Sequence, residues 1–246
     1  MTQPSDNLTA AVVGASGYAG SVLTGLLLNH PNVTVTHLYV SERSADAGKP
    51  VAAIDARLTG RTDLTLEPLT DPAAAAQNLD MVFLATDHAV SAALAPVFTA
   101  AGCTVFDLSG AYRLADPADY PKYYGFEHAA PECLRRAVYA LAEFVDQKKL
   151  RAADLVSLPG CYPTASQLAL KPLIDAGLLD PAVKPVIDAV SGVSGAGRKA
   201  KLNSAFCEVS LSAYGVFTHR HRPEIEKHLG RRVIFTPHLV CFKPVS

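Results

Sequence analysis

Short apolar runs and helical apolar spacings take turns along the first half of the chain. The apolar run at residues 8–13 ends at a cluster of glycines, as expected of a buried parallel strand. Helical spacing follows over residues 18–29, and β-branched and aromatic residues over 33–40 predict the second strand. The same alternation predicts two further strands and the helix between them, at residues 81–85, 104–108 and 89–101. We therefore expect an α/β fold with a doubly wound parallel sheet.

The pattern is less regular beyond residue 110. Residues 111–131 are rich in Asp, Pro, Tyr and Gly, which predicts an ordered loop region over the sheet. A strand at residues 154–158 runs into a helix at 164–176. The remaining predicted elements are a strand at 186–190, a glycine-rich run at 191–197, a helix at 223–229 and a strand at 232–235. This order predicts a first domain over residues 1–153 and a second over residues 154–246.

The composition argues against several classes of protein. Charged residues make up 18% of the 246 residues and the formal net charge is -1, so no broad basic face for nucleic acid is expected. No run of about 18 apolar residues occurs, which argues against a transmembrane helix, and the polar N-terminus does not resemble a secretory signal. Five widely spaced cysteines without a Cys-x-x-Cys pair argue against a disulfide framework or a metal site, and favour a reduced, cytoplasmic protein.

A glycine-rich turn separates the first predicted strand from the first helix. Its sequence, Gly14-Ala-Ser-Gly-Tyr-Ala-Gly20, has the spacing Gly-x-x-Gly-x-x-Gly. Glycines here permit a tight turn and close approach to a pyrophosphate, while the helix N-terminus offers N–H groups to the phosphates. Any strand–helix turn can need glycine, but its place after the first strand of an alternating series indicates dinucleotide binding. The predicted cofactor-binding residues are Gly14, Ser16, Gly17, Tyr18, Ala19 and Gly20.

The choice between the two nicotinamide cofactors rests on residues about twenty positions after this turn. Glu42 alone would favour NAD through the ribose hydroxyls, whereas Arg43 with its flanking serines can bind a 2′-phosphate. We expect Ser41 and Arg43 to bind NADP(H). The alternative is a solvated loop after a strand, which suits Glu42 better than Arg43.

One of the five cysteines stands where a reactive thiol is expected. Cys161 follows a strand and a Pro-Gly pair, and it precedes a helix. The positive end of that helix favours the thiolate. Cysteine is more often a small buried hydrophobic residue, and this interpretation is applied to Cys103, Cys133, Cys207 and Cys241. Backbone N–H groups after Cys161 are candidate donors for a developing oxyanion.

Two histidines offer partners that can move protons for such a thiolate. His219 and His221 flank Arg220, an always-charged side chain suited to a carboxylate or phosphate. In extended backbone the two rings would point to the same side. His88, at the start of a helix, could equally be a cap or a core residue. Thiolate, histidine and nicotinamide together indicate attack on an activated carbonyl, departure of a leaving group and hydride transfer to a thioester.

Five motifs occur in the order seen in N-acetyl-gamma-glutamyl-phosphate reductases, and the chain resembles that family from about Ala10 to about Leu239. The motifs are Gly14-Ala-Ser-Gly-Tyr-Ala-Gly20, Phe106-Asp-Leu-Ser-Gly-Ala-Tyr-Arg113, Pro159-Gly-Cys-Tyr-Pro-Thr164, Ser191-Gly-Val-Ser-Gly-Ala-Gly-Arg-Lys199 and His219-Arg-His221. The third and fourth together distinguish this family from aspartate-semialdehyde dehydrogenases, which share the architecture and the chemistry.

The resemblance implies a Rossmann dinucleotide-binding domain over residues 1–153 and an α+β catalytic domain of the semialdehyde dehydrogenase type over 154–246. The implied reaction, a step of arginine biosynthesis, is the NADPH-dependent reduction of N-acetyl-gamma-glutamyl phosphate to the semialdehyde with release of phosphate. Cys161 would be the nucleophile, His219 the acid/base group, and His221 a substrate-orienting residue or alternative base. The other implied contacts are Ser109, Arg113, Arg198 and Tyr214 for substrate or its phosphate, and Gly192, Ser194 and Gly195 for the nicotinamide end.

Two alternative functions stay open. A related acyl-phosphate reductase would act on an aspartyl or aminoadipyl substrate, and substrate profiling would separate it from the first hypothesis. A non-catalytic dinucleotide-binding remnant, for example a redox sensor, would bind nucleotide and be unaffected by Cys161→Ser.

The end of the sequence departs from the family pattern. The family continues beyond Leu239 with an arginine-containing stretch, further strands and a helix, whereas this sequence stops at Ser246. We therefore expect an incomplete catalytic domain with unpaired strand edges and bare apolar surface. This polypeptide alone is expected to be poorly active, which phosphate-dependent NADP reduction with the semialdehyde would measure. A complete member is expected to form a homo-oligomer.

Overall fold

The computed structural model describes residues 7–200, 202, 205 and 210–241. These residues form two compact units, one from the chain up to residue 117 with residues 128–158, the other from residues 118–127 with the chain from 159 onward. The strand predicted at 154–158 belongs to the first unit, beyond the boundary expected at residue 153, because it is hydrogen-bonded into that unit's sheet.

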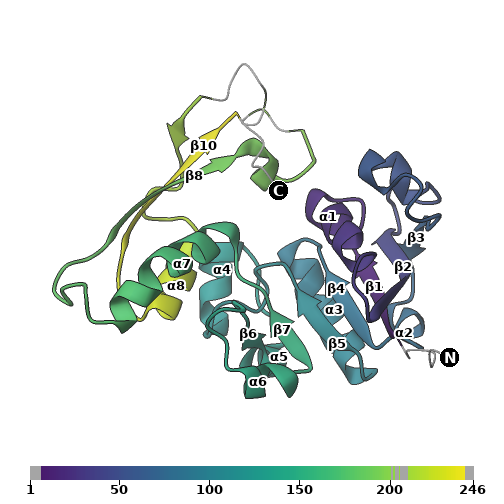
Figure 1. Ribbon diagram of the computed structural model, residues 1–246, viewed down its shortest axis with the longest axis horizontal. Helices are drawn as coiled ribbons and strands as arrows, with labels where there is room; N and C mark the ends of the chain where they lie inside the picture. Colours follow the sequence, from purple (N-terminus) through teal and green to yellow (C-terminus); the bar gives the residue numbers. More distant parts are fainter. Residues whose placement is uncertain (1–6, 201, 203–204, 206–209, 242–246) are drawn as a thin grey trace. The chain divides into compact units, whose positions relative to one another are not determined.

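The first unit is built on a parallel sheet of seven strands among the described residues (Figure 1). The strands are β1 (Leu8–Val13), β2 (Val33–Ser41), β3 (Leu66–Leu69), β4 (Met81–Leu84), β5 (Thr104–Asp107), β6 (Val138–Tyr139) and β7 (Leu155–Ser157). Their order is β3-β2-β1-β4-β5-β7-β6, so the chain runs outward from β1 on one side and then, from β4, on the other, where β7 lies between β5 and the edge strand β6. The predicted doubly wound parallel sheet is confirmed.

Helices return the chain between these strands. Among them, α1 (Tyr18–Leu27) contacts β1 and β2, and α3 (His88–Ala100) contacts β4 and β5. The shorter helices of this unit are α2 (Pro72–Ala75), α5 (Pro131–Arg136) and α6 (Gln147–Arg151). The central strands carry the apolar core, in which Val12, Leu38 and Leu66 are almost fully buried. Near-continuous apolar runs suit strands that are covered on both faces.

The region predicted as a loop over residues 111–131 contains regular structure. Helix α4 (Tyr120–Tyr124) lies within it, with Pro121 in its first turn, where proline needs no N–H partner. Gly125 ends the helix in a left-handed conformation. The segment 118–127 belongs to the second unit, which splits the first unit in sequence.

The second unit combines a three-stranded sheet with two longer helices. The strands are β8 (Val186–Gly192), β9 (Ser212–Ala213) and β10 (Ile234–Val240), in the order β8-β10-β9. β10 pairs with β8 in parallel and with β9 in antiparallel orientation. Helices α7 (Cys161–Asp175) and α8 (His221–Leu229) pack together, and their buried cluster is Tyr162, Ile225, Leu229, Val233 and Phe235.

Several predicted boundaries in this unit are wrong by a few residues. Helix α7 begins at Cys161 rather than Thr164, because Pro163 is tolerated in the first helical turn. Helix α8 begins at His221 and the last strand extends to Val240. Across the described part of the chain, no helix is long and apolar enough to cross a membrane.

Candidate active site

Cys161 is exposed and is the first residue of α7. Gly160 is the N-cap in extended conformation, and its carbonyl accepts the first helical hydrogen bond from the Thr164 amide at 2.9 Å. The amides of Cys161 and Tyr162 precede this bond, and Pro163 has no N–H. The thiol therefore lies at the positive end of a helix beside amide groups that the helix itself does not use.

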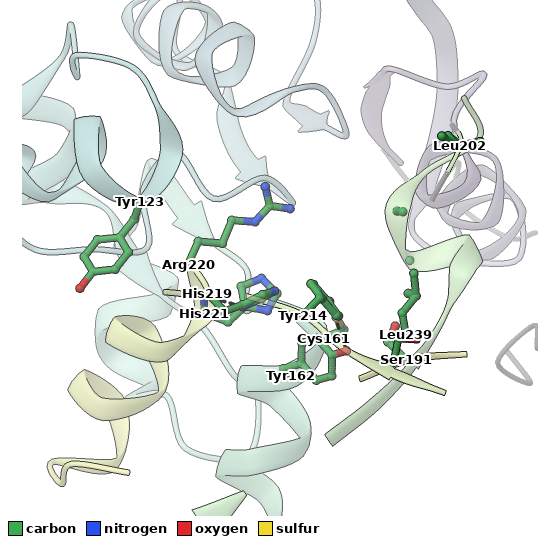
Figure 2. Close-up of a pocket in the computed structure, with 13 residues that line it drawn as sticks. Tyr123, Cys161, Tyr162, Ser191, Leu202, Tyr214, His219, Arg220, His221 and Leu239 are labelled. Atoms are coloured by element: carbon green, nitrogen blue, oxygen red, sulfur yellow. Dashed lines mark hydrogen bonds between the residues drawn. The ribbon is translucent and has the colours of Figure 1, made fainter. Parts of the chain in front are cut away.

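Cys161 opens onto a pocket of about 860 Å³ within the second unit (Figure 2). The side chains around the thiol come from the start of α7, from the segment before α8 and from the strands. They include Tyr162, Ser191, Tyr214, His219, Arg220 and His221. The pocket thus brings together the predicted nucleophile and both predicted histidines. Tyr123 of α4 also lines it, a residue that no sequence motif indicated.

The two histidines do not lie in extended backbone, the case in which both rings would point to the same side, since His221 is the first residue of α8. Their rings nevertheless meet edge to face, with centroids 4.9 Å apart. The amide of His221 donates to Nδ1 of His219 at 3.1 Å. An amide N–H can only donate, so the neutral His219 ring holds its proton at Nε2.

Aromatic rings surround His219 and control its charge. Tyr162, Tyr214 and Phe235 stand edge-on to its ring, with centroids 5.6, 5.3 and 5.6 Å away. Burial and, to a smaller extent, the charge of Arg220 lower the pKa of His219 from 6.5 to about 4. The ring is therefore neutral at pH 7.

Two tyrosines form a short chain of hydrogen bonds behind the histidine. Tyr214 Oη donates to Tyr162 Oη at 3.3 Å, and Tyr162 Oη donates to the carbonyl of His238 at 3.0 Å. Burial raises the pKa of both phenols. Both groups therefore stay protonated at neutral pH, and Tyr214 lines the same pocket as Cys161.

The predicted nicotinamide-end residues lie at and beyond the end of β8. Gly192 is buried, and Ser194 and Gly195 form a single 3₁₀ turn with their neighbours. A Cβ at Gly195 would lie 2.8 Å from Ser191 Oγ, so this turn passes close to the strand end. Gly195 and Ser191 both line the pocket of Cys161, whereas Arg198 is exposed after the turn and is not among the lining residues.

Ser109 and Arg113 lie in the first unit, where both are buried. Arg113 Nε donates to the carbonyl of Leu158 and one terminal nitrogen donates to that of Leu108, each at 2.7 Å. Ser109 Oγ accepts the amide of Ala111 at 3.0 Å. These bonds order the loop after β5. Nearby, Nδ1 of His88 accepts the amide of Gly110 at 2.8 Å, so His88 also has a structural partner.

The glycine turn of the first unit is tightly packed against neighbouring backbone. Gly14 has φ +87°, and a Cβ there would lie 2.4 Å from the carbonyl oxygen of Ala85. A Cβ at Gly20 would lie 2.3 Å from the oxygen of Gly14. These contacts keep the turn tight against the strand and bring the N-terminus of α1 close to the strand ends. The turn follows β1 at the carboxyl end of the strand, and the strand order reverses between β1 and its sheet neighbour β4.

The residues predicted to select the cofactor lie at the same end of this sheet. Val13 of β1 pairs with Tyr39 of β2, and Ser41 and Arg43 follow at the end of β2. Both are exposed, as is Tyr18 at the start of α1. The backbone amides of Gly14 and Ala15 bond to Tyr39, and Ser16 and Ala19 complete the turn between them and α1. These positions fit the diphosphate and ribose of a dinucleotide.

The remaining cysteines divide by burial. Cys103 and Cys133 are buried, as predicted for core residues, and burial raises the pKa of the Cys103 thiol. Cys241 is exposed, contrary to that interpretation, because it follows the last strand, and Cys207 lies outside the described residues. Within the described ranges, no cluster of histidine, cysteine and carboxylate side chains could hold a metal ion.

One buried carboxylate beside the nucleophile was missed in the sequence. Glu224 of α8 is fully buried, and its Oε1 accepts the amide of Gly160 at 3.0 Å. The signal available was its spacing: once the helix is started at His221, Glu224 lies one turn later on the same face. Tyr162 was also missed, although it directly follows the nucleophile.

Comparison with known proteins identifies the family. The model described as "Semialdehyde dehydrogenase, NAD binding domain" matches residues 9–153, and "Semialdehyde dehydrogenase, dimerisation domain" matches residues 161–244. The N-acetyl-gamma-glutamyl-phosphate reductase of Yersinia pseudotuberculosis serotype I (strain IP32953) is 60% identical over 235 residues, which are 96% of this chain and 70% of that protein. The enzyme of the same name from Escherichia coli (strain K12) is 57% identical over the same shares.

Solved structures show the same fold. Aspartate semialdehyde dehydrogenase II of Vibrio cholerae, complexed with ASA, has a TM-score of 0.64 at 18% identity and covers 97% of this chain and 71% of its own. A probable aspartate-semialdehyde dehydrogenase of Pseudomonas aeruginosa has a TM-score of 0.62 at 22% identity, with 98% and 76% covered. The sequence matches go further than this likeness of fold: the chain belongs to the N-acetyl-gamma-glutamyl-phosphate reductase family.

Proposed function

We propose that this protein reduces N-acetyl-gamma-glutamyl phosphate to N-acetyl-glutamate 5-semialdehyde with release of phosphate, a step of arginine biosynthesis, with NADPH as the reductant. The observation that carries the proposal is Cys161 at the N-terminus of α7, in one pocket with His219 and His221. The close sequence relatives carry the name of this reaction. A semialdehyde dehydrogenase fold accommodates the same chemistry on other substrates, so the relatives decide the substrate.

The first chemical step belongs to Cys161. Its thiolate attacks the carbonyl carbon of the acyl phosphate, the carbon–oxygen bond to phosphate breaks, and the acyl group remains as a thioester on the sulfur. NADPH, held by the glycine turn and by Ser41 and Arg43, would supply the hydride that this carbonyl carbon accepts. The carbon–sulfur bond then breaks, the aldehyde leaves, and Cys161 is again a thiolate. The helix N-terminus favours the thiolate at both ends of this cycle.

The carbonyl oxygen gains charge each time the carbon becomes tetrahedral. The amides of Cys161 and Tyr162 lie at the start of α7 and are suited to stabilise this charge by donating hydrogen bonds to the oxygen. His219, neutral with its proton at Nε2, is a third donor, and we assign to it the acid/base role towards this oxygen. His221 orients the substrate or serves as the alternative base, since it lines the same pocket and its ring contacts His219.

The first unit supplies the dinucleotide site in this proposal. Gly14, Gly17 and Gly20 permit close approach of the diphosphate, with the helix N-terminus of α1 at its phosphates. Ser41 and Arg43 contact the 2′-phosphate of NADP(H), since an arginine there provides a charged fork that NAD would leave unused. The assignment of Gly192, Ser194 and Gly195 to the nicotinamide end stays a prediction.

Substrate contacts are proposed on two grounds. Tyr214 shares the pocket of Cys161 and presents a protonated phenol, so it is suited to the acyl or acetamido oxygen. The assignment of Ser109, Arg113 and Arg198 to substrate or phosphate stays a prediction. We further propose that the protein self-associates through its second unit, which matches a dimerisation domain, and that it acts in the cytoplasm, where a thiol nucleophile stays reduced.

Trapping the acyl group tests the function without requiring turnover. The chain is incubated with N-acetyl-gamma-glutamyl phosphate in the absence of NADPH, and peptides are examined by mass spectrometry. A thioester on the Cys161 peptide is expected, absent in Cys161→Ala and retained in Cys241→Ser, which removes another exposed thiol. Faster acylation by aspartyl or aminoadipyl phosphate would reassign the substrate. Nucleotide binding with no acylation by any of the three would favour the non-catalytic function.

A further inference from the structure

Glu224 is a buried acid that the proposed reaction does not yet use. It lies in the first turn of α8 next to Ile225, and both side chains are fully buried. Placing a carboxylate in such an environment is costly unless hydrogen bonds or charges compensate. A residue of this kind in a small apolar core calls for a specific partner.

Glu224 has a partner next to the nucleophile, the backbone amide of Gly160. Glu224 Oε1 accepts the amide of Gly160 at 3.0 Å, across 64 positions of sequence. Gly160 is the N-cap of α7 and directly precedes Cys161. A hydrogen bond from an amide to a carboxylate is stronger than one between neutral groups. It also accounts for the Gly160 amide, which the helix leaves unused.

The two histidines lie at the start of α8, where His221 is the first helical residue and His219 comes just before it. His221 starts α8 and Glu224 follows three positions later, so the two share a face of the helix. His219 is held against His221 by the amide bond to its Nδ1 and by ring contact. The bond between Glu224 and Gly160 therefore joins the helix that begins at His221 to the residue before the nucleophile.

We infer that Glu224 is a positioning residue: by holding the amide of Gly160, it fixes the thiol of Cys161 against the paired imidazoles and the amides that begin α7. This inference rests on the proposed function for the role of Cys161. It does not require Glu224 to touch substrate. What it requires is an acceptor oxygen at this distance, whether or not that oxygen carries a charge.

Glu226 provides a matched control on the same helix. Its Oε1 accepts the amide of Val233 at 3.3 Å and pairs with Arg222 Nε at 3.4 Å. It therefore also ties α8 to neighbouring backbone, but to Val233 instead of to the residue that precedes Cys161. Loss of the Glu226 side chain should lower the stability of the protein and leave the position of Cys161 unchanged.

The test compares Glu224→Gln, Glu224→Asp, Glu224→Ala and Glu226→Ala in the full chain. Gln keeps the acceptor oxygen and removes the charge, whereas Asp keeps the charge and falls one methylene short. The first readout is the pH midpoint of Cys161 alkylation by iodoacetamide, followed on its peptide, which needs no enzymatic turnover. The second is the rate of acylation by the acyl phosphate, and the third is the urea unfolding midpoint.

Glu224→Gln and Glu226→Ala are expected to keep the wild-type alkylation midpoint. Glu224→Asp and Glu224→Ala are expected to raise the pH midpoint of Cys161 alkylation towards about 8.5, the ordinary pKa of a cysteine thiol. Acylation should slow roughly 10- to 100-fold in these two, the size of effect that a displaced reacting group produces. If the Glu224→Ala variant does not fold, the folded Glu224→Asp variant is sufficient for this test.

Two results would overturn the inference. If Glu224→Gln and Glu224→Ala lowered the alkylation midpoint equally, the negative charge of Glu224, and not its hold on the Gly160 amide, would be what acts on the thiol. Unchanged alkylation in Asp and Ala, with only the unfolding midpoint reduced, would show a purely structural role. Absence of acylation in the wild-type chain would instead count against the proposed function, while the alkylation series would still decide the role of Glu224.

Discussion

The ring of Tyr162 stands edge-on to the ring of His219, with centroids 5.6 Å apart and planes at 86°. Tyr162 directly follows Cys161 in α7, so the helix that presents the thiol also supports the histidine. The phenol of Tyr162 is anchored in turn on the backbone of β10 through His238. The position of His219 therefore depends on α7 and β10 as well as on its own segment.

Tyr162→Ala should lower the free energy of unfolding by about 3–5 kcal/mol, because it empties a buried aromatic position. Tyr162→Phe should cost only about 1 kcal/mol, the net worth of the hydrogen bond to His238. Urea denaturation of both variants checks this order. Tyr18→Phe serves as the control, since that ring is half exposed, and it should leave the curve unchanged. Equal losses for Phe and Ala at position 162 would contradict the packing role.

The pH dependence of stability should reveal the neutral state of His219. Burial lowers its folded pKa to about 4, below the unfolded value near 6.5, so the unfolded chain binds the extra proton more readily. The stabilisation is full above about pH 6.5 and is lost as the pH falls towards 4. The loss should be about 1–3 kcal/mol, since the ring is partly exposed.

Urea unfolding at pH 7.5 and pH 5 measures this loss. His219→Asn keeps an acceptor for the His221 amide but has no titrating ring, so its stability should change less between the two values. Burial also lowers the pKa of His128, but that residue is present in both proteins and cancels in the comparison. An identical pH dependence in the two proteins would refute the assignment.

Gly14→Ala should damage the dinucleotide site more than a comparable change elsewhere. Its φ is +87° and the added Cβ would lie 2.4 Å from the oxygen of Ala85. Gly102 has nearly the same φ, +91°, with nothing within 4 Å of an added Cβ. Gly102→Ala should therefore cost about 1 kcal/mol from backbone strain alone. The thermal shift on adding NADP should be lost in Gly14→Ala and kept in Gly102→Ala; a shift preserved in both would argue against the turn as the binding site.

Arg43→Ala should weaken NADP binding and leave NAD binding nearly unchanged. Loss of a charged hydrogen bond costs about 1.5–3 kcal/mol, which corresponds to a roughly 10- to 100-fold rise in Kd. Titration calorimetry with both nucleotides measures the difference. Arg135→Ala, which removes an exposed arginine of α5 paired with Glu132, should alter neither. Equal weakening for NAD and NADP would remove Arg43 from the 2′-phosphate site.

The sequence by itself determined the features that depend on local pattern. Alternating apolar runs and helical spacings predict the parallel sheet, because burial on both faces requires continuous apolar strands. The glycine turn and the thiol at a helix start are also local, since each depends on a few neighbouring residues. The family motifs added the reaction, because they join these local features in one order.

Only the tertiary structure decided which distant residues meet. The bond between Glu224 and Gly160 spans 64 positions, and the contact of Tyr162 with His219 joins α7 to the segment before α8. The tertiary structure also assigned residues 118–127 to the second unit and β7 to the first. Periodicity along a chain records which face of an element is buried but not what covers it. The neutral state of His219 follows from such packing, since its pKa is lowered chiefly by burial, to which Tyr162 and Phe235 from distant parts of the sequence contribute.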